Sequence, residues 1–137
     1  MQPEYKDNGR IRLNIMLPSE IFLEKEVLQV RAESHAGEFC LKPRHIDYVT
    51  SLVPGILSYM DLNKSSRFVA IDGGILVKEK EEVAVATRNA VEGELGTLVE
   101  IVRKMQDDFL EREKMNRSAS AKLEIGFLKQ FIRLSGH

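Results

Sequence analysis

The first two thirds of the chain alternate short apolar runs with turn residues, a pattern that predicts β-strands. In residues 11–17 the aliphatic side chains at 11, 13, 15 and 17 alternate with Arg12, Asn14 and Met16, a period of two that suggests a half-buried strand, and Pro18 ends the run. From Gly37 to Val85 further apolar runs recur at short intervals. These runs are 39–41, 48–52, 56–59, 68–71, 75–77 and 83–85. Many short strands at regular spacing predict a sandwich or a flattened barrel.

Proline and glycine separate several of these predicted strands. Val53-Pro54-Gly55 lies between runs 48–52 and 56–59, and Asp72-Gly73-Gly74 lies between runs 68–71 and 75–77. Proline cannot donate a hydrogen bond to a β-ladder, so it is expected at strand ends. The glycine pair permits positive φ or the close approach of another backbone segment.

The pattern changes near Asn89, where apolar residues begin to recur every three or four positions. This spacing is typical of amphipathic helices. The first stripe comprises Leu95, Leu98, Val102, Met105 and Phe109. A second stripe occupies residues 123–134, after Asn116 and Ser118, which favour a helix end or cap. We therefore predict two antiparallel helices joined by a short link.

Composition excludes several classes of partner. The 137 residues include 20 basic and 21 acidic side chains, so no global field attracts nucleic acid or an anionic membrane. No apolar run approaches the ~20 residues that a bilayer span needs, and the polar N-terminus lacks the apolar segment of a signal peptide. The single Cys40 fits a reducing compartment. We expect a cytoplasmic chain that neither binds nucleic acid nor inserts directly into a membrane.

Candidate catalytic residues are few. His35, His45 and His137 lack the i, i+4 and His-x-His spacings of metal sites. Cys40 lies close to His45 in sequence, as a nucleophile lies near its base, but a strand cysteine is more often a small buried hydrophobe. Asp72-Gly73-Gly74 does not match a phosphate-binding loop. The sequence predicts no catalytic residue, metal or cofactor, with a small metal or thiol enzyme using Cys40 and His45 as an alternative.

One central stretch carries a family pattern. The epsilon subunit of F-type ATP synthases has the pattern G-E-x-x-L-x-P-x-H…L-x-P-G, which Gly37-Glu38, Leu41, Pro43, His45, Leu52 and Pro54-Gly55 resemble. Blocks 68–77 and 83–90 resemble the family's next blocks, so the resemblance extends from Leu13 to Leu134. It implies a flattened antiparallel β-sandwich of about ten strands followed by an antiparallel helix hairpin. The expected division is a disordered leader (1–10), a sandwich domain (11–91) and a helix-hairpin domain (92–137).

Three residues depart from the common epsilon pattern and resemble an alternate branch of the family. Cys40 and Arg44 occupy positions where small or glycine residues are usual, and Arg88 occupies a position where an acidic residue is common. These departures are similar to the epsilon subunit of the N-ATPases, which are often sodium-linked. The resemblance implies that the ion site, which selects protons or sodium, lies in other subunits of the complex.

The resemblance implies a rotor subunit with no chemistry of its own. Such a subunit links gamma to the membrane c-ring in the central stalk, as a peripheral part of the F1 sector on the cytoplasmic face of the membrane. Glu38 and His45 match family positions near the c-ring, and we infer that Arg44 pairs with an acidic c-ring loop. Without the resemblance, these residues are interpreted as solvent-facing turn and loop residues. The alternative function is a free-standing β-sandwich adaptor whose helix hairpin mediates self-association.

The predicted helices suggest a regulatory role. In some relatives the helix hairpin binds ATP and, when extended, inhibits hydrolysis by inserting among the alpha and beta catalytic subunits. The ATP-associated pattern I/L-D-x-x-R-A is not matched by residues 95–100, so we expect no ATP site. Inhibition needs only basic and apolar contacts and is kept as a hypothesis, although the basic residues also suit a solvated helix face. The candidate contacts are Arg103, Lys104, Lys122, Lys129 and Arg133.

Overall fold

The computed structural model describes residues 9–134, and it describes side chains for residues 9–116. The leader expected in residues 1–10 therefore lies almost entirely outside the described residues. By its internal contacts the chain divides into two units, Met1–Gln106 and Asp107–His137. The first unit contains the β-strands and the beginning of a helix, and the second contains the rest of that helix.

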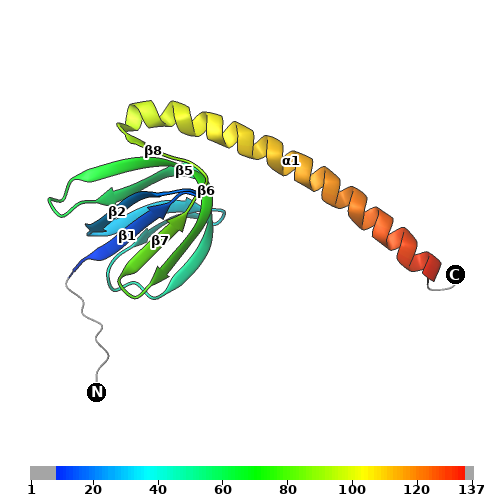
Figure 1. Cartoon of the computed structure of the whole chain (residues 1–137), viewed down its shortest axis with the longest axis horizontal. Coiled ribbons are helices and arrows are strands. Elements are labelled where there is room, and N and C mark those ends of the chain that lie inside the picture. The colour runs from blue at the N-terminus through cyan, green and yellow to red at the C-terminus, as the bar shows by residue number, and fades with distance from the viewer. Residues whose placement is uncertain (1–8, 135–137) are drawn as a thin grey trace, which may run out of the picture. The chain divides into compact units, whose positions relative to one another are not determined.

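The first unit contains eight strands in one continuous sheet (Figure 1). They are β1 (Ile11–Met16), β2 (Ile21–Val27), β3 (Gln29–Ser34), β4 (Gly37–Leu41), β5 (Tyr48–Met60), β6 (Ser66–Glu79), β7 (Glu82–Ala86) and β8 (Ala90–Gly93). Their order is β2-β1-β7-β6-β5-β3-β4, and β8 pairs with β6. The pairings are antiparallel except that β1 runs parallel to β7. The expected β-sandwich architecture is confirmed, with one parallel pair that the sequence pattern did not indicate.

The strand number differs from the expected ten because two pairs of predicted strands are continuous. Runs 48–52 and 56–59 both belong to β5, and runs 68–71 and 75–77 both belong to β6. The proline and glycine residues between them bend the strands without ending them. β5 and β6 stay paired on both sides of the bend, from Tyr48 opposite Lys78 to Met60 opposite Ser66.

The bend exchanges the faces of both long strands. Leu52 and Leu57 on β5 both face the core although they are an odd number of residues apart, and Ile71 and Leu76 on β6 behave in the same way. Gly74 adopts φ 128°, and a Cβ added there would collide with the carbonyl group of Ala86. The close backbone approach predicted for the glycine pair is therefore confirmed, and it lets the sheet fold over on itself.

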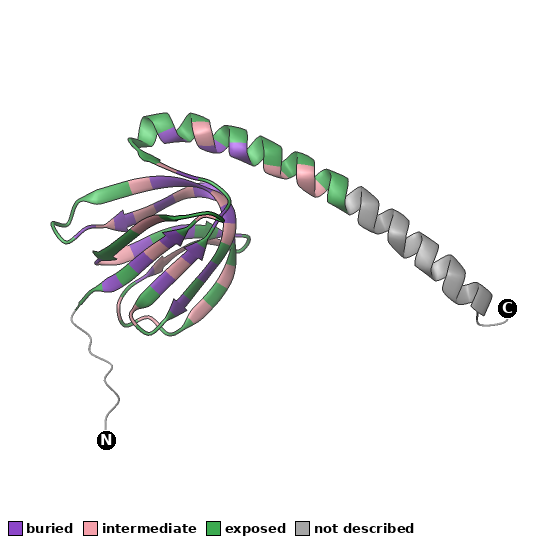
Figure 2. Ribbon diagram, viewed as in Figure 1, coloured by how far each residue is buried: buried purple, intermediate pink, exposed green. Residues whose placement is uncertain are grey.

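The core lies between the two layers of the folded sheet. In β1, the alternation predicted from the sequence buries Ile11, Leu13 and Ile15 completely while their neighbours remain accessible. The same alternation occurs in β3 and β7, and buried residues are distributed over the strands of the sandwich (Figure 2). Residues from all eight strands contribute to this core.

The start of the helix covers the outer face of one layer. Helix α1 (Leu95–Leu134) buries Leu98, Val102 and Met105 against Ala70 of β6. These three positions belong to the predicted apolar stripe, so this part of the stripe is confirmed as a packing face. Gln106 Nε2 also donates a hydrogen bond to the carbonyl oxygen of Pro54 at 3.3 Å.

The predicted helix hairpin is wrong, because α1 is one continuous helix of 40 residues. Asn116 and Ser118 were expected to interrupt it. Their lower helix propensity costs only a few tenths of a kcal/mol each, and neither glycine nor proline lies nearby to stop the helix. Within the described part of the chain, no helix is both long enough and apolar enough to cross a membrane.

Candidate functional site

A loop between β4 and β5 contains two of the three residues expected near the c-ring. We call residues 42–47 the docking loop. It begins with a tight turn in which the His45 amide donates a hydrogen bond to the Lys42 carbonyl oxygen at 3.0 Å. Pro43 occupies the second position of that turn, where its fixed φ is favourable. The turn places Arg44 at an exposed tip.

Lys78 of β6 holds the docking loop from inside the protein. Its side chain is only 1% exposed, and its Nζ donates hydrogen bonds of 2.6 Å to the carbonyl oxygens of His45 and Lys80. Asp47 Oδ1 in turn accepts a hydrogen bond of 2.9 Å from the Lys80 amide. The docking loop is thus joined to β6 and to the turn between β6 and β7.

The His45 ring has a defined orientation. Its Nδ1 lies 2.8 Å from the carbonyl oxygen of Ile46, so Nδ1 must carry a proton to donate. The ring meets Tyr48 edge to face, with centroids 5.8 Å apart. This arrangement leaves Nε2 as the ring nitrogen that can accept a hydrogen bond.

The three residues expected at the c-ring occupy two different places. Arg44 and His45 lie together in the docking loop, whereas Glu38 is an exposed residue near the start of β4, the strand that precedes the loop. β4 is an edge strand of the sheet, and the docking loop follows directly after it, so Glu38 lies on this strand and Arg44 and His45 lie just beyond its end. Ile46 is 78% exposed in the same loop, and the sequence reasoning did not single it out.

The geometry of Cys40 does not favour the alternative thiol enzyme. Cys40 is half-buried on β4 and pairs with Arg31 of β3 in the ladder. The Nδ1 atom of His45 is engaged with its neighbouring carbonyl oxygen, not with the thiol. Among the residues that the structure describes, no group of three His, Cys, Asp or Glu side chains is arranged to hold a metal ion.

A second surface, which the sequence reasoning did not identify, is the outer side of the layer formed by β2, β1, β7 and parts of β6 and β5. Residues paired across strands share a face of a sheet. One row of pairs runs from Ser51 through Ile75, Ala86 and Met16 to Ile21, and the next runs from Val49 through Val77 and Ala84 to Asn14 and Glu24. We define the outer apolar face as Met16, Ile21, Val49, Ile75 and Val77.

Large apolar side chains on this face are open to solvent. Ile21, Val49 and Ile75 are 62%, 68% and 55% exposed. The first turns of α1 cover the corresponding face of the other layer, so the two sides of the sandwich differ. Contiguous exposed apolar side chains mark sites of protein association more often than isolated ones do.

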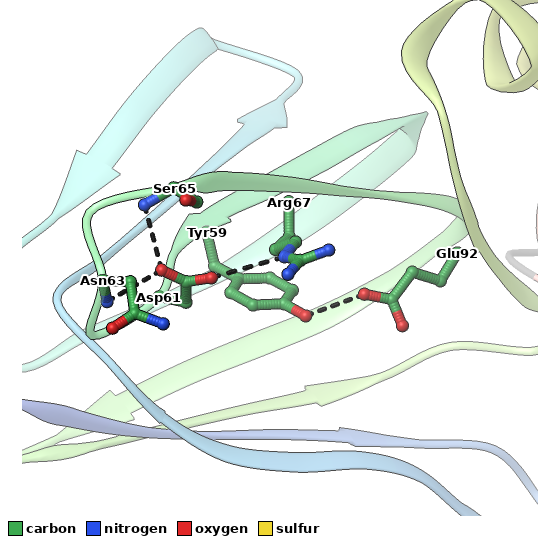
Figure 3. Close-up of polar contacts among 6 residues, drawn as sticks. All are labelled: Tyr59, Asp61, Asn63, Ser65, Arg67 and Glu92. Carbon is green, nitrogen blue, oxygen red and sulfur yellow. Dashed lines mark hydrogen bonds and ion pairs between the residues drawn. The ribbon is translucent and has the colours of Figure 1, made fainter.

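A third group of polar side chains lies where the chain leaves the sandwich for α1 (Figure 3). Asp61 Oδ1 accepts hydrogen bonds of 2.9 Å from the amides of Asn63 and Ser65, and its Oδ2 accepts one of 3.3 Å from Arg67 Nε. These bonds, that of Ser65 foremost, lower the pKa of the Asp61 carboxyl group. Tyr59 is buried next to this loop, and desolvation together with its bond to Glu92 raises the pKa of its hydroxyl group.

A shallow cleft of about 420 Å³ opens beside this network. Its lining includes Arg67, Phe68, Glu92, Glu94 and Leu95. The cleft lies at the start of α1, the position at which the ATP-associated pattern was sought. Two carboxylates line it, and the guanidinium of Arg67 already binds Asp61, so the lining does not favour a polyphosphate.

The proposed helix contacts are only partly described. Arg103 is exposed and forms an ion pair of 3.2 Å with Glu100, one turn earlier, and Lys104 is also exposed. Lys122, Lys129 and Arg133 lie in the part of α1 whose side chains are outside the described residues.

Comparison with known proteins decides the family. Residues 10–93 match the family model for the ATP synthase, Delta/Epsilon chain, beta-sandwich domain. The chain belongs to the ATP synthase delta/epsilon family. The matched residues begin immediately before β1 and end with β8, so they cover the complete sandwich. The resemblance to an F-type ATP synthase epsilon subunit, drawn from the residues around the docking loop, is therefore confirmed.

Relatives extend the similarity into the helix. The chain is 27% identical to "ATP synthase epsilon chain 2" of Paraburkholderia xenovorans over 126 residues, which cover 90% of this chain and 91% of that protein. It is 29% identical to the "ATP synthase epsilon chain" of Rickettsia conorii over 102 residues, covering 73% and 91% of the two chains.

Solved structures share the fold of this ATP synthase subunit. A chain in the structure of the Euglena gracilis mitochondrial ATP synthase, determined with its OSCP, F1 and c-ring parts, aligns with a TM-score of 0.62. The identity is 20%, and the alignment covers 76% of this chain and 68% of that one. The likeness supports the sandwich architecture.

Proposed function

We propose that this chain is a non-catalytic central-stalk subunit that connects gamma to the c-ring and transmits torque between them. The observation that carries the proposal is that one sandwich bears two uncovered surfaces of different chemistry. These are the outer apolar face and the docking loop, and both are fixed to the same core. A connector between two partners needs this arrangement, whereas a free-standing enzyme needs neither surface.

The outer apolar face suits gamma. Met16 of β1 and Ile75 and Val77 of β6 project on either side of β7 from the same face of the sheet, so a partner can cover them with one flat contact. Each apolar square ångström removed from water stabilises such a contact by about 25 cal/mol. A stable association of this type fits a subunit that must turn together with its partner.

The docking loop suits the polar loops of a c-ring. Arg44 offers a guanidinium that binds carboxylates through paired hydrogen bonds, and Ile46 offers an apolar tip beside it. Glu38 supplies the opposite charge on the edge strand that precedes the loop. Mixed charges of this kind give register and specificity in a contact between proteins.

The remaining parts of the proposal rest on the family resemblance. We propose that the chain belongs to the N-ATPase branch, in a complex peripheral to the cytoplasmic face of the membrane. We also propose that α1 contacts the alpha and beta subunits through Arg103, Lys104, Lys122, Lys129 and Arg133 and restrains ATP hydrolysis without binding ATP. Residues 11–91 act as the sandwich domain in this scheme, and residues 92–137 act as the regulatory domain.

Binding measurements with separately purified gamma and c-ring test the proposal. Ile75→Glu and Val49→Glu should weaken gamma binding at least tenfold, about 1.4 kcal/mol each. Leu62→Glu is the matched control, because Leu62 is an exposed apolar residue in the loop after β5, away from the outer apolar face. Arg44→Ala should weaken c-ring binding and leave gamma binding unchanged.

A wild-type chain that fails to bind gamma at micromolar concentration, and instead shows a monomer–dimer equilibrium, contradicts the proposal. That result favours the free-standing adaptor.

A further inference from the structure

We propose that Lys78 is a positioning residue that presets the docking loop in the conformation that meets its partner. The inference deepens the proposed function and rests on it, because it assumes that the docking loop contacts the c-ring. The observation behind it is that the buried ammonium group of Lys78 forms hydrogen bonds to both the docking loop and the turn between β6 and β7.

The position of Lys78 in β6 is unusual for a lysine. It lies two residues after the fully buried Leu76, so the strand alternation points its side chain toward the core and not toward solvent. A lysine is rarely buried to this extent, because its ammonium group must replace the hydrogen bonds that water provides. The stem of Lys78 therefore fills the end of the core, and its Nζ depends on partners within the protein.

The known partners of Nζ are main-chain oxygens of two separate segments. The His45 carbonyl belongs to the docking loop and the Lys80 carbonyl belongs to the turn, each at 2.6 Å. Hydrogen bonds from a charged donor are stronger than those between neutral groups, particularly away from water. Moving either segment away removes a bond that the buried ammonium group needs.

Asp47 and Lys80 form a further contact between the docking loop and the turn between β6 and β7. Lys80 adopts φ 56°, a left-handed conformation uncommon for residues with a side chain. Its amide binds Asp47 Oδ1 at 2.9 Å while its carbonyl accepts from Lys78. The docking loop is therefore fixed at His45 and at Asp47, one residue on each side of the exposed Ile46.

Fixing both sides of Ile46 has a consequence for binding. A loop that already has its bound conformation loses less conformational entropy when it docks, so its affinity is higher. Arg44 is one residue before the fixed His45 carbonyl, so its direction also depends on the Lys78 contact. The effect of Lys78 on the partner is indirect, since its own side chain is buried.

Substitution of Lys78 by methionine tests the inference in the full chain bound to gamma. Methionine keeps an unbranched apolar stem and removes the ammonium group. We expect hydrogen exchange of the His45 and Lys80 amides to accelerate at least tenfold, while amides of β1 keep their protection. We also expect c-ring affinity to fall about tenfold with gamma affinity unchanged.

Two further variants control the test. Lys80→Met is the same substitution two residues away at an exposed side chain, and it leaves the main-chain contacts of Lys80 in place; it should have no effect. Asp47→Ala removes the second fixed point without altering the core, so it should loosen the loop even if Lys78→Met folds poorly. The effects of Lys78→Met and Asp47→Ala should be less than additive, because both act on one loop.

The outcomes separate this inference from the proposed function. Unchanged exchange of the loop amides in both Lys78→Met and Asp47→Ala overturns the positioning role. So does a c-ring affinity that falls in Arg44→Ala but not in Lys78→Met. If Arg44→Ala and His45→Ala both leave c-ring affinity unchanged, the docking site itself is wrong, and the positioning role is overturned with it.

Discussion

The hydroxyl group of Tyr59 donates a hydrogen bond to Glu92 Oε2 at 2.8 Å. This bond joins β5 to β8, the strand that leads directly into α1. Lys25 Nζ lies 5.5 Å from the centroid of the Tyr59 ring, which adds a cation–π contact from β2. A buried tyrosine thus contacts side chains of two other strands, and Figure 3 shows the one to Glu92, which precedes the helix.

Tyr59 makes stability sensitive to alkaline pH. Burial raises the pKa of its hydroxyl group above the ordinary value of 10. The folded protein therefore keeps this proton at pH values where the unfolded chain releases it. Stability from this group is complete below pH 10 and is lost as pH rises from 10 toward the folded pKa.

Tyr59→Phe should reduce the free energy of unfolding by about 0.5–1.5 kcal/mol at neutral pH, because it removes one hydrogen bond. The decrease in the free energy of unfolding with rising pH above 10 should also be smaller, because Tyr59 no longer contributes to it. Urea unfolding at several pH values from 7 to 11 measures both effects. An identical slope in wild type and Tyr59→Phe would contradict the assignment, and Tyr48→Phe serves as the control for losing a tyrosine.

Asp61 makes stability sensitive to acid. Its pKa is lowered in the folded protein, first by the Ser65 amide and then by Arg67 and the Asn63 amide. The stabilisation is therefore present above the unfolded pKa of about 3.9 and is lost as pH falls through the folded value. Asp61→Ala should have a lower melting temperature than wild type at pH 7. The difference between the two melting temperatures should be smaller at pH 2. A melting temperature unchanged at pH 7 would show that the loop after β5 does not need this carboxylate.

Replacing Gly74 or Gly96 by alanine should change the free energy of unfolding in opposite directions. Gly74→Ala introduces a Cβ against the Ala86 carbonyl at positive φ, so it should destabilise the sandwich by more than about 2 kcal/mol. Gly96→Ala lies in α1 with open space around its Cβ, so it should stabilise the helix by roughly 0.5–1 kcal/mol. Denaturant unfolding measures both values, and a neutral Gly74→Ala would contradict the close approach at the bend.

Leu98 should anchor the first turns of α1. It is fully buried against Ala70, so Leu98→Ala should cost about 2–4 kcal/mol of the local packing free energy. Leu95→Ala is the matched control, because Leu95 lies in the same turn and is exposed. Hydrogen exchange of residues 98–106 should accelerate in Leu98→Ala and not in Leu95→Ala, with the β1 amides unaffected in both. Equal protection in the two variants would mean that the turn does not depend on this contact.

Much of the sandwich was predictable because burial on one face of a strand leaves a period of two in the sequence. Ile11, Leu13 and Ile15 are an example, and the structure buries all three. The continuity of β5 and β6 was not predictable, since Pro54 and Gly73-Gly74 are equally compatible with a strand end and with a sharp bend. Only the pairing of the two long strands with each other decides between these interpretations.

The site was less predictable than the fold. Arg44 and His45 stand out through a family pattern, whereas Lys78 begins a charged run with Glu79 and Lys80, which by itself suggests a solvated turn. Lys78 lies two residues after Leu76, and in a strand this spacing indicates that both side chains point toward the core. The outer apolar face gives no local signal, because its residues come from four strands and become neighbours only after the sheet has formed.

The parallel pairing of β1 with β7 has a consequence for the order of events on the ribosome. Leu13 lies beside Val83, which is synthesised roughly seventy residues later. Contacts between such distant segments form slowly, since a long stretch of chain must be ordered before they close. Met16 and Ala86 likewise meet only through this pair. The nascent chain therefore lacks a complete outer apolar face until β7 has emerged, which delays subunit capture until the sandwich is closed.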